Sequence, residues 1–477
     1  MAESLKQKTV RGTLWSAVER LATQAVQFVV MIVMARMLTP DDYGLVAMLA
    51  VFIAVAQSLV DSGFTQALIR KRDRTDTDCC TVFYFNIAAG VLLYLVFFAS
   101  APLIAGFYDE PVLVPLTRVI CLCVIINSFA LVQRALLTIN IDFKPLAKAS
   151  LIAAGLSGII GIILAWQGAG VWAIVWQTLA NLALNAALLW WFTAWRPRLL
   201  YSWASFLELF GFGSKLAGAG VIDTVYRNMY QLVIGKVFSA ADLGYYTRAQ
   251  QFAELPSSNL SGIIQRVTFP VLCTVSNDEA RMADGYRRLL RFSAFAVFPL
   301  MMLLAAVARP LVEVLLPPRW AFAATLPSIL CFQMMWYPIH AINLNLLNVV
   351  GRSDLFLKLE VWKKLIGVSL LAATLPFGLV PLCWGSVGAS LIALVINTHY
   401  TGRFIHVGFM QQIRDFMPAL LNSLFSGAVA WFVASIMPGV YAALAAALAA
   451  GAACYLLTAR LYGADELKEL ANIIKRR

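Results

Sequence analysis

The sequence predicts an all-α membrane protein of about 14 transmembrane helices, in two repeated bundles around a central cavity. Of its 477 residues, 61% are hydrophobic and only 13% are charged. A soluble domain has roughly 45–50% apolar and about 25% charged residues. Each crossing of the hydrocarbon takes roughly 20 apolar residues, and no long polar stretch is left for a soluble domain.

The expected helices are the apolar runs between turn-forming segments such as Thr39-Pro40-Asp41-Asp42 and Pro438-Gly439. They form a six-helix bundle in residues 1–200, a second in residues 201–405, and two additional helices with a cytoplasmic tail in residues 406–477. The runs are 11–38, 42–66, 80–106, 113–136, 147–167, 171–193, 209–238, 246–272, 290–316, 321–349, 357–377, 381–403, 415–436 and 440–460.

Basic residues indicate the orientation of these helices. Lysine and arginine gather at the N-terminus, in the even-numbered loops and in the tail, as in Arg70–Arg74 and Arg287–Arg291, and the odd-numbered loops hold few. Because Lys and Arg mark the cytoplasmic side, both termini are expected in the cytoplasm, which requires an even number of helices. The net charge of +12 therefore reflects topology, and no nucleic-acid partner is expected.

Cysteine and histidine suggest no reactive centre. The eight cysteines lack metal-ligand spacing and lie mostly in apolar runs, so they are interpreted as buried hydrophobic residues. His340, His399 and His406 are scattered, and His340 is expected to pack beside Trp336 and Tyr337. We therefore predict no catalytic residues, no bound metal and no cofactor.

An internal repeat supports the two-bundle arrangement. Residues 35–45 read ARMLTPDDYGL and residues 235–245 read GKVFSAADLGY, so that Thr39, Asp42 and Gly44 align with Ser239, Asp242 and Gly244. Each segment follows a helix with a polar stripe and precedes another helix. Parallel repeats of this kind are typical of transporters whose substrate path lies between the halves.

Polar residues inside the membrane cost free energy and therefore mark functional candidates. In the first helix, Arg20, Gln24 and Gln27 recur at steps of four and three, which places them on one face. The seventh and eighth expected helices carry similar stripes, and the remaining helices are more uniformly apolar. The predicted cavity residues are Arg20, Gln24, Gln27, Lys215, Arg227 and Arg266, and the candidates for ion coupling are Asp61, Asp223 and Glu254.

Basic residues outnumber acidic ones in this set. Arginine stays protonated and its planar guanidinium matches phosphate oxygens, so a basic cavity suits a diphosphate headgroup or an acidic sugar. Two local alternatives stay open. Asp223 and Arg227, four residues apart, can neutralise each other. Arg20, beside Glu19, and Arg266 can extend to the membrane surface.

At residues 35–45 and 243–250 (LGYYTRAQ), the chain resembles Wzx-type polysaccharide flippases. These form the polysaccharide transporter family of the multidrug/oligosaccharidyl-lipid/polysaccharide exporter superfamily, and residues 9–44 resemble its branch for colanic acid and similar exopolysaccharides. The resemblance implies a bacterial inner-membrane protein that moves undecaprenyl-diphosphate-linked oligosaccharides by alternating access, with proton or sodium coupling. It implies membrane lipid as a partner, and also a polysaccharide polymerase and a chain-length regulator.

Two other classes of function compete with this interpretation. A drug/cation antiporter of the same superfamily would need an acidic or aromatic cavity, which the basic excess disfavours. A membrane glycan polymerase or ligase would need a catalytic centre, commonly on a large periplasmic loop, and the odd-numbered loops are short and hold no Arg/His cluster. An ATP-driven exporter is also disfavoured, because residues 211–215 (GFGSK) lack the Gly-Lys pair of a P-loop.

Overall fold

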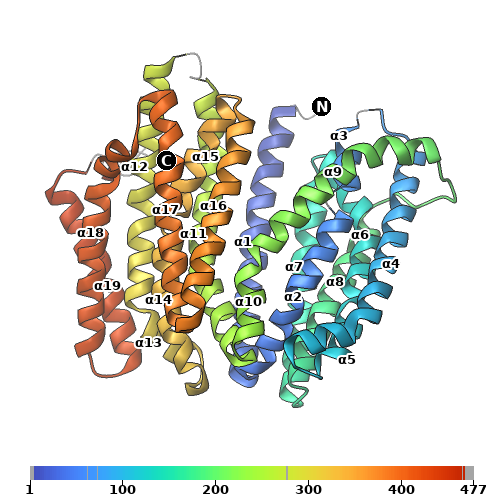
Figure 1. Cartoon of the computed structure of the whole chain (residues 1–477), viewed down its shortest axis with the longest axis horizontal. Coiled ribbons are helices and arrows are strands. Elements are labelled where there is room, and N and C mark those ends of the chain that lie inside the picture. Colours follow the sequence, from blue (N-terminus) through green and yellow to red (C-terminus); the bar gives the residue numbers. More distant parts are fainter. Residues whose placement is uncertain (1–4, 62, 72, 275–277, 465, 468–477) are drawn as a thin grey trace. The chain divides into compact units, whose positions relative to one another are not determined.

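The computed structural model describes residues 5–61, 63–71, 73–274, 278–464 and 466–467, and the side chains of 5–19, 212, 263, 266–267, 269–271 and 353 also fall outside the description. Every regular element in the described residues is a helix (Figure 1). Contacts divide the chain into two compact units, residues 1–244 and 245–477. The division falls after Gly244, and α9 packs on α2 and α3 of the first unit.

The first unit contains the helices before the second repeat segment. The helices of this unit that pack most extensively on each other are α1 with α7, α7 with α8, and α4 with α6. The bounds are α1 (Leu5–Met37), α2 (Pro40–Asp61), α3 (Phe64–Arg70), α4 (Asp76–Tyr108), α5 (Leu113–Ile120), α6 (Leu122–Ile139), α7 (Phe143–Trp166), α8 (Val171–Phe192), α9 (Trp203–Arg227) and α10 (Met229–Val237).

The second unit begins within α11 and repeats part of this order. In both units a long helix with an internal proline, α4 or α12, precedes an eight-residue helix, α5 or α13. The bounds are α11 (Ala240–Thr274), α12 (Glu279–Ala306), α13 (Ala308–Leu315), η1 (Pro318–Ala324), α14 (Thr325–Met334), α15 (Tyr337–Val349), α16 (Ser353–Thr374), η2 (Leu375–Phe377), α17 (Leu379–Ile405), α18 (Phe409–Ile436) and α19 (Val440–Leu461).

The helix content confirms the predicted fold class of a polytopic all-α membrane protein. Among the described residues, 11 helical segments are long and apolar enough to cross a membrane. The long helices α9, α11 and α16 coincide with three further expected runs and carry more charge. Several expected runs are interrupted: 42–66 is divided between α2 and α3, and 209–238 between α9 and α10 at Asn228.

Helix α7 illustrates how the first unit packs without a hydrophobic driving force between its helices. Its buried face consists of small residues, and a Cβ added at Gly158 would lie 2.4 Å from a methyl carbon of Val30 on α1. Small residues let helices approach closely in lipid, where van der Waals packing drives association. The large side chains point outward: Leu151, Ile152, Leu156, Ile159, Ile160 and Ile163 are all exposed.

The two repeat segments have the same local structure. Thr39 Oγ1 donates to Asp42 Oδ2 at 2.7 Å and accepts from the Asp42 amide at 3.3 Å. Ser239 Oγ makes the same bonds with Asp242, at 2.7 and 3.1 Å. Each pair satisfies amide groups that the first turn of a helix leaves without intrahelical partners. The aligned residues Thr39/Ser239 and Asp42/Asp242 therefore start α2 and α11 in the same way.

The beginnings of α2 and α11 also cross each other in direct backbone contact. A Cβ added at Gly44 would lie 1.7 Å from the carbonyl oxygen of Ala240, and one added at Gly244 would lie 2.0 Å from the carbonyl oxygen of Pro40. The crossing is reciprocal, so each repeat segment supplies the glycine that admits the other's backbone. A second close approach, between Gly63 and Gly213, brings α9 against the break between α2 and α3.

Within the second unit, a partly buried ion pair joins α18, the first of the two additional helices, to α12. Arg287 on α12 donates to both carboxylate oxygens of Asp415 on α18, at 2.7 and 2.6 Å, and the Asp415 side chain is 4% exposed. Bidentate geometry makes this pair strong as well as directional. Beyond it, Asn422 on α18 donates to the Tyr455 carbonyl on α19.

The glycine crossing predicts a sharp position dependence of stability. Gly44→Ala and Gly244→Ala each place a methyl group against backbone, which no rotamer change relieves, so each should lower the free energy of unfolding by about 1–3 kcal/mol or more. The melting temperature of the detergent-purified protein measures this. Gly155→Ala on α7 is the control, because nothing lies within 4 Å of its added Cβ, and it should not destabilise. Equal melting temperatures for Gly44→Ala and Gly155→Ala would contradict the crossing.

Candidate functional site

The polar face of α1 carries an exposed positive charge. Arg20 and Gln27 are exposed and Gln24 is half-buried, as expected for residues at helical spacing on one face. The Gln24 Oε1 atom is shielded from solvent and has no hydrogen-bond partner in the described part of the chain. In the same residues, Arg20 has neither a hydrogen-bond nor an ion-pair partner. The role of Arg20 as a cavity residue stays a prediction.

Helix α9 carries the other predicted cavity residues of the first unit. Lys215 is exposed, and no described residue pairs with it. Arg227 Nε lies 2.7 Å from Asp223 Oδ2, and the two side chains are 76% and 44% exposed. The structure thus forms the local i, i+4 pair that the spacing allows, and Asp223 offsets part of the charge of Arg227. Lys215 has no such carboxylate beside it.

Asp61 lies at the end of α2 in a polar environment that spans two helices. It is half-buried, and its Oδ1 accepts a hydrogen bond of 2.9 Å from the Asn127 amide on α6. In the same unit, Thr65 Oγ1 and both polar atoms of Asn86 are buried without described partners. A carboxylate held by one amide in a transmembrane segment keeps acceptor capacity for a cation or proton.

The remaining candidates, Glu254 and Arg266, are on α11 in the second unit. Glu254 is exposed. Arg266 lies within the helical backbone of α11, but its side chain is outside the described residues. The candidates of the first unit thus lie on three helices, α1, α2 and α9, and among those that the structure describes only Asp223 and Arg227 contact each other directly.

A charged and aromatic cluster fixes the start of α9 within the first unit. Lys71 Nζ lies 2.8 Å from Glu208 Oε2 on α9 and 3.2 Å from Asp78 Oδ1 on α4. The hydrogen bond and charge of Glu208, followed by those of Asp78, raise the pKa of Lys71 above its usual value. Next to it, the Phe206 ring lies 5.8 Å from that of Phe64 and 5.1 Å from that of Phe85.

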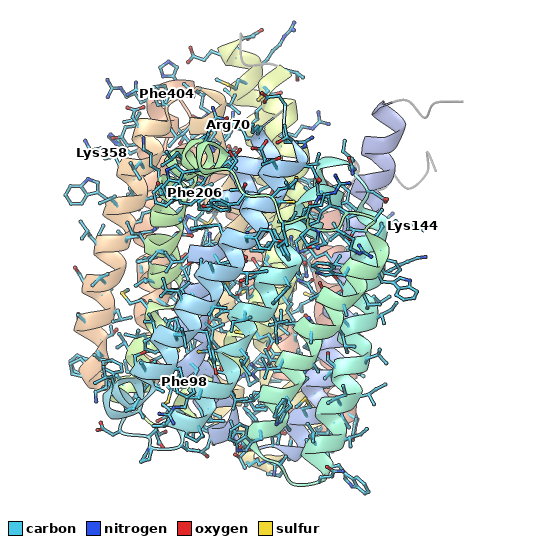
Figure 2. The ribbon with its side chains drawn as sticks, turned by 90° about the vertical axis from the view of Figure 1, so that its right-hand side faces the viewer. Arg70, Phe98, Lys144, Phe206, Lys358 and Phe404 are labelled. Carbon is cyan, nitrogen blue, oxygen red and sulfur yellow. The ribbon has the colours of Figure 1, made fainter. Side chains whose placement is uncertain are left out.

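Figure 2 shows which end of the first unit this cluster occupies. Arg70 and Phe206 lie at the same end, and Phe98 lies at the other. Arg70 is one of the even-loop residues that the charge bias assigns to the cytoplasm. The cluster around Lys71 therefore holds α9 at the end of the unit that the basic loops mark.

The sequence interpretation missed a polar network in the second unit, where α15 to α17 were expected to be uniformly apolar. His340 on α15 lies between two side chains of α17, with Nε2 3.0 Å from Ser390 Oγ and Nδ1 3.2 Å from Asn397 Nδ2. Gln412 on α18 is fully buried and donates to Asn343 Oδ1 and Thr401 Oγ1. A signal was present: Ser386, Ser390 and Asn397 recur at helical spacing in α17.

The fold and the distribution of charge define a polytopic membrane transporter. The chain belongs to a family described as "Polysaccharide biosynthesis protein", whose model matches residues 33–325. It is 25% identical to the teichuronic acid biosynthesis protein TuaB of Bacillus subtilis, over 95% of each chain. It is also 25% identical to the lipopolysaccharide biosynthesis protein WzxC of Escherichia coli, over 76% of this chain and 74% of the other.

Solved structures show the same fold. The lipid II flippase MurJ in an inward closed conformation superposes with a TM-score of 0.78, at 13% identity, covering 95% of this chain and 100% of that one. This agreement over nearly the whole length confirms the fold class. The match to the family model confirms the family resemblance seen in residues 35–45 and 243–250.

The cluster at the start of α9 predicts unequal contributions from its two carboxylates. Lys71→Met removes the cation from Asp78, whose side chain is 1% exposed, and should cost about 1–3 kcal/mol. Glu208→Gln should cost at most about 1 kcal/mol, because Glu208 is 61% exposed and solvent screens its pair. Thermal unfolding of both variants in the same detergent shows which substitution lowers stability more. A larger loss for Glu208→Gln would show that the Asp78 contact contributes little.

Proposed function

We propose that this protein translocates undecaprenyl-diphosphate-linked oligosaccharide repeat units from the cytoplasmic to the periplasmic leaflet of the bacterial inner membrane. The observation that carries the proposal is the pair of exposed cations, Arg20 on α1 and Lys215 on α9, which have no partner among the described residues. A charge left in this way inside a membrane segment calls for a ligand or for water. A diphosphate supplies the matching negative oxygens.

The names of the relatives indicate the kind of cargo. TuaB and WzxC take part in teichuronic acid and lipopolysaccharide biosynthesis, and MurJ flips lipid II. These cargoes share a large polar saccharide, which cannot cross about 30 Å of hydrocarbon unaided. A protein with the same fold and a basic polar face meets that requirement by giving the headgroup a wet path while the prenyl chain stays in lipid.

Alternating access is the mechanism that the repeat supports. Two related bundles can rock so that a polar site faces each leaflet in turn. Asp61, Asp223 and Glu254 are the candidates for ion coupling, and Asp61 has the most enclosed environment of the three.

Three substitutions test the basic site. Arg20→Gln and Lys215→Gln should each lower transport at least about tenfold, because each removes a charged hydrogen bond worth about 1.5–3 kcal/mol. Arg227→Gln should have a smaller effect, since Asp223 already offsets its charge. The assay is complementation of a deletion strain, with lipid-linked oligosaccharide accumulating on the cytoplasmic leaflet measured directly.

Lys148→Gln is the matched control for these variants. Lys148 is also exposed, and it lies near the start of α7, outside the predicted set of cavity residues. Normal transport by Lys215→Gln at normal expression would refute the basic site. Loss of resistance to cationic drugs in the deletion strain, without accumulation of the lipid-linked intermediate, would favour the drug/cation antiporter instead.

We propose further that both termini face the cytoplasm. A green fluorescent protein fused after Arg477 should fluoresce, and alkaline phosphatase at the same position should be inactive, because phosphatase folds only in the periplasm. Phosphatase inserted at Gly439, in the turn between α18 and α19, should be active. Active phosphatase at the C-terminus would reverse the topology and contradict the charge bias.

A further inference from the structure

His340 is an ionisable residue inside a transmembrane segment, and the transport proposal gives it no role. It lies in the apolar segment Pro318–Val349 of the second unit, and its two polar neighbours on α17 lie in the segment Leu379–Ile405. It precedes Val349 by nine residues, or about 14 Å of helix. Intramembrane histidines are costly and are functional candidates by default.

The hydrogen bonds around the imidazole form a directed chain. The Asn397 amide nitrogen, which can only donate, faces Nδ1 at 3.2 Å, so Nδ1 is the unprotonated nitrogen. Nε2 then carries the proton and donates to Ser390 Oγ at 3.0 Å. Ser390 Oγ in turn lies 3.5 Å from the Gln333 carbonyl oxygen on α14. The surroundings thus select one tautomer of the neutral imidazole.

The same neighbours contain an acceptor for a second proton. Asn397 is 1% exposed, and its Oδ1 is buried with no hydrogen-bond partner in the described residues. An unsatisfied buried acceptor is uncommon and costs free energy. Rotating the Asn397 amide by half a turn would bring Oδ1 to Nδ1, where it could accept only if Nδ1 carried a proton.

The rotation preserves the number of hydrogen bonds. With neutral His340, Asn397 Nδ2 is bonded and Oδ1 is not. With the imidazolium, Oδ1 would be bonded and Nδ2 would not. Neither state satisfies the whole amide, but the bond that the imidazolium makes is charge-assisted and is the stronger of the two. An amide that can bond either form of the imidazole suits a group that must gain and release a proton.

Charged groups near His340 come mainly from α16. Among the helices that pack on α15, namely α12, α16 and α17, the charge that acts on the imidazole is Lys363 of α16. Lys363 is paired with Glu360, and these side chains are 13% and 28% exposed. On α12, Arg287 is engaged by Asp415, and α17 faces the ring with Ser390 and Asn397. A carboxylate beside Lys363 moderates the repulsion that an imidazolium would meet.

We propose that His340 and Asn397 form a proton-binding site within the second unit, in which amide rotation accompanies protonation of Nδ1. The proton adds to the Nδ1 lone pair, no other bond forms or breaks, and the site gains one positive charge. The site goes beyond the proposed glycan transport and stands without it. It is distinct from Asp61, which lies in the first unit.

Only three histidines occur in the chain, so solid-state NMR of the full-length protein can observe the site directly. In a His399→Gln/His406→Gln background, labelled with ¹⁵N-histidine and reconstituted in liposomes, His340 is the only signal. The neutral form should be the Nε2–H tautomer, and acidification should protonate Nδ1 reversibly. An Nδ1–H tautomer at alkaline pH, or no protonation down to pH 4, would overturn the proposal.

Two variants of Asn397 separate this site from a histidine that merely packs. Asn397→Asp supplies only acceptors to Nδ1 and should raise the midpoint pH of the His340 titration by about one pH unit or more. Asn397→Leu supplies none and should lower it by a similar amount. Unchanged midpoints in both would refute the role of the amide. Ser390→Ala, which leaves Nδ1 and its partner in place, should shift the midpoint less than either.

A transport measurement then distinguishes failure of this site from failure of the proposed function. A fluorescent short-chain polyprenyl diphosphate in proteoliposomes serves as the probe, with and without a pH gradient. Movement that the gradient stimulates in the wild type but not in His340→Gln would add a coupling role to the site. Gradient stimulation retained in His340→Gln would confine the site to proton binding without coupling. A probe that never moves counts against the flippase, and the NMR titration still decides the site.

Discussion

Hydrocarbon solvates neither a charge nor an unpaired backbone group, and this constraint explains most of the structure. Every backbone polar group in a span must be satisfied internally, so the described regular elements are all helices. Because lipid is as apolar as leucine, the helices gain nothing by hiding large side chains from it. Helix α7 accordingly turns its alanines and glycines inward and its leucines and isoleucines outward. The α2–α11 crossing is the extreme case, where two glycines bring backbone against backbone.

The same constraint sorts the polar side chains by whether the protein itself satisfies them. Asp415 is engaged by Arg287, and Gln412 by Asn343, within the second unit, so these pairs hold helices together. Arg20 and Lys215 are exposed and unpaired among the described residues. Asp223 and Arg227 fall between these groups, since they are paired but remain largely exposed. A paired side chain must lose a contact within the protein before it can bind an external ligand, whereas an unpaired side chain need not.

The sequence predicted local features well and long-range contacts poorly. Thr39 and Asp42 are three residues apart, so the cap they form can be read from the chain, as can the match with Ser239 and Asp242. The Asp223–Arg227 pair follows from helical spacing in the same way. In contrast, Asn127 is 66 residues from Asp61 and Asn397 is 57 from His340. No periodicity encodes such partners, because they depend on how separate helices pack.

Breaks within the spans were missed for a related reason. The apolar run 42–66 was expected to be one helix, whereas α2 ends at Asp61 and α3 begins at Phe64, where Gly63 lies against Gly213 of α9. The polar network of α15–α17 was overlooked because serine and asparagine are mild interruptions in a long apolar pattern. Their role is evident only in the structure, where His340 lies between Ser390 and Asn397. In a membrane protein, an isolated small polar residue carries more information than its hydropathy suggests, since lipid gives it no other hydrogen-bond partner.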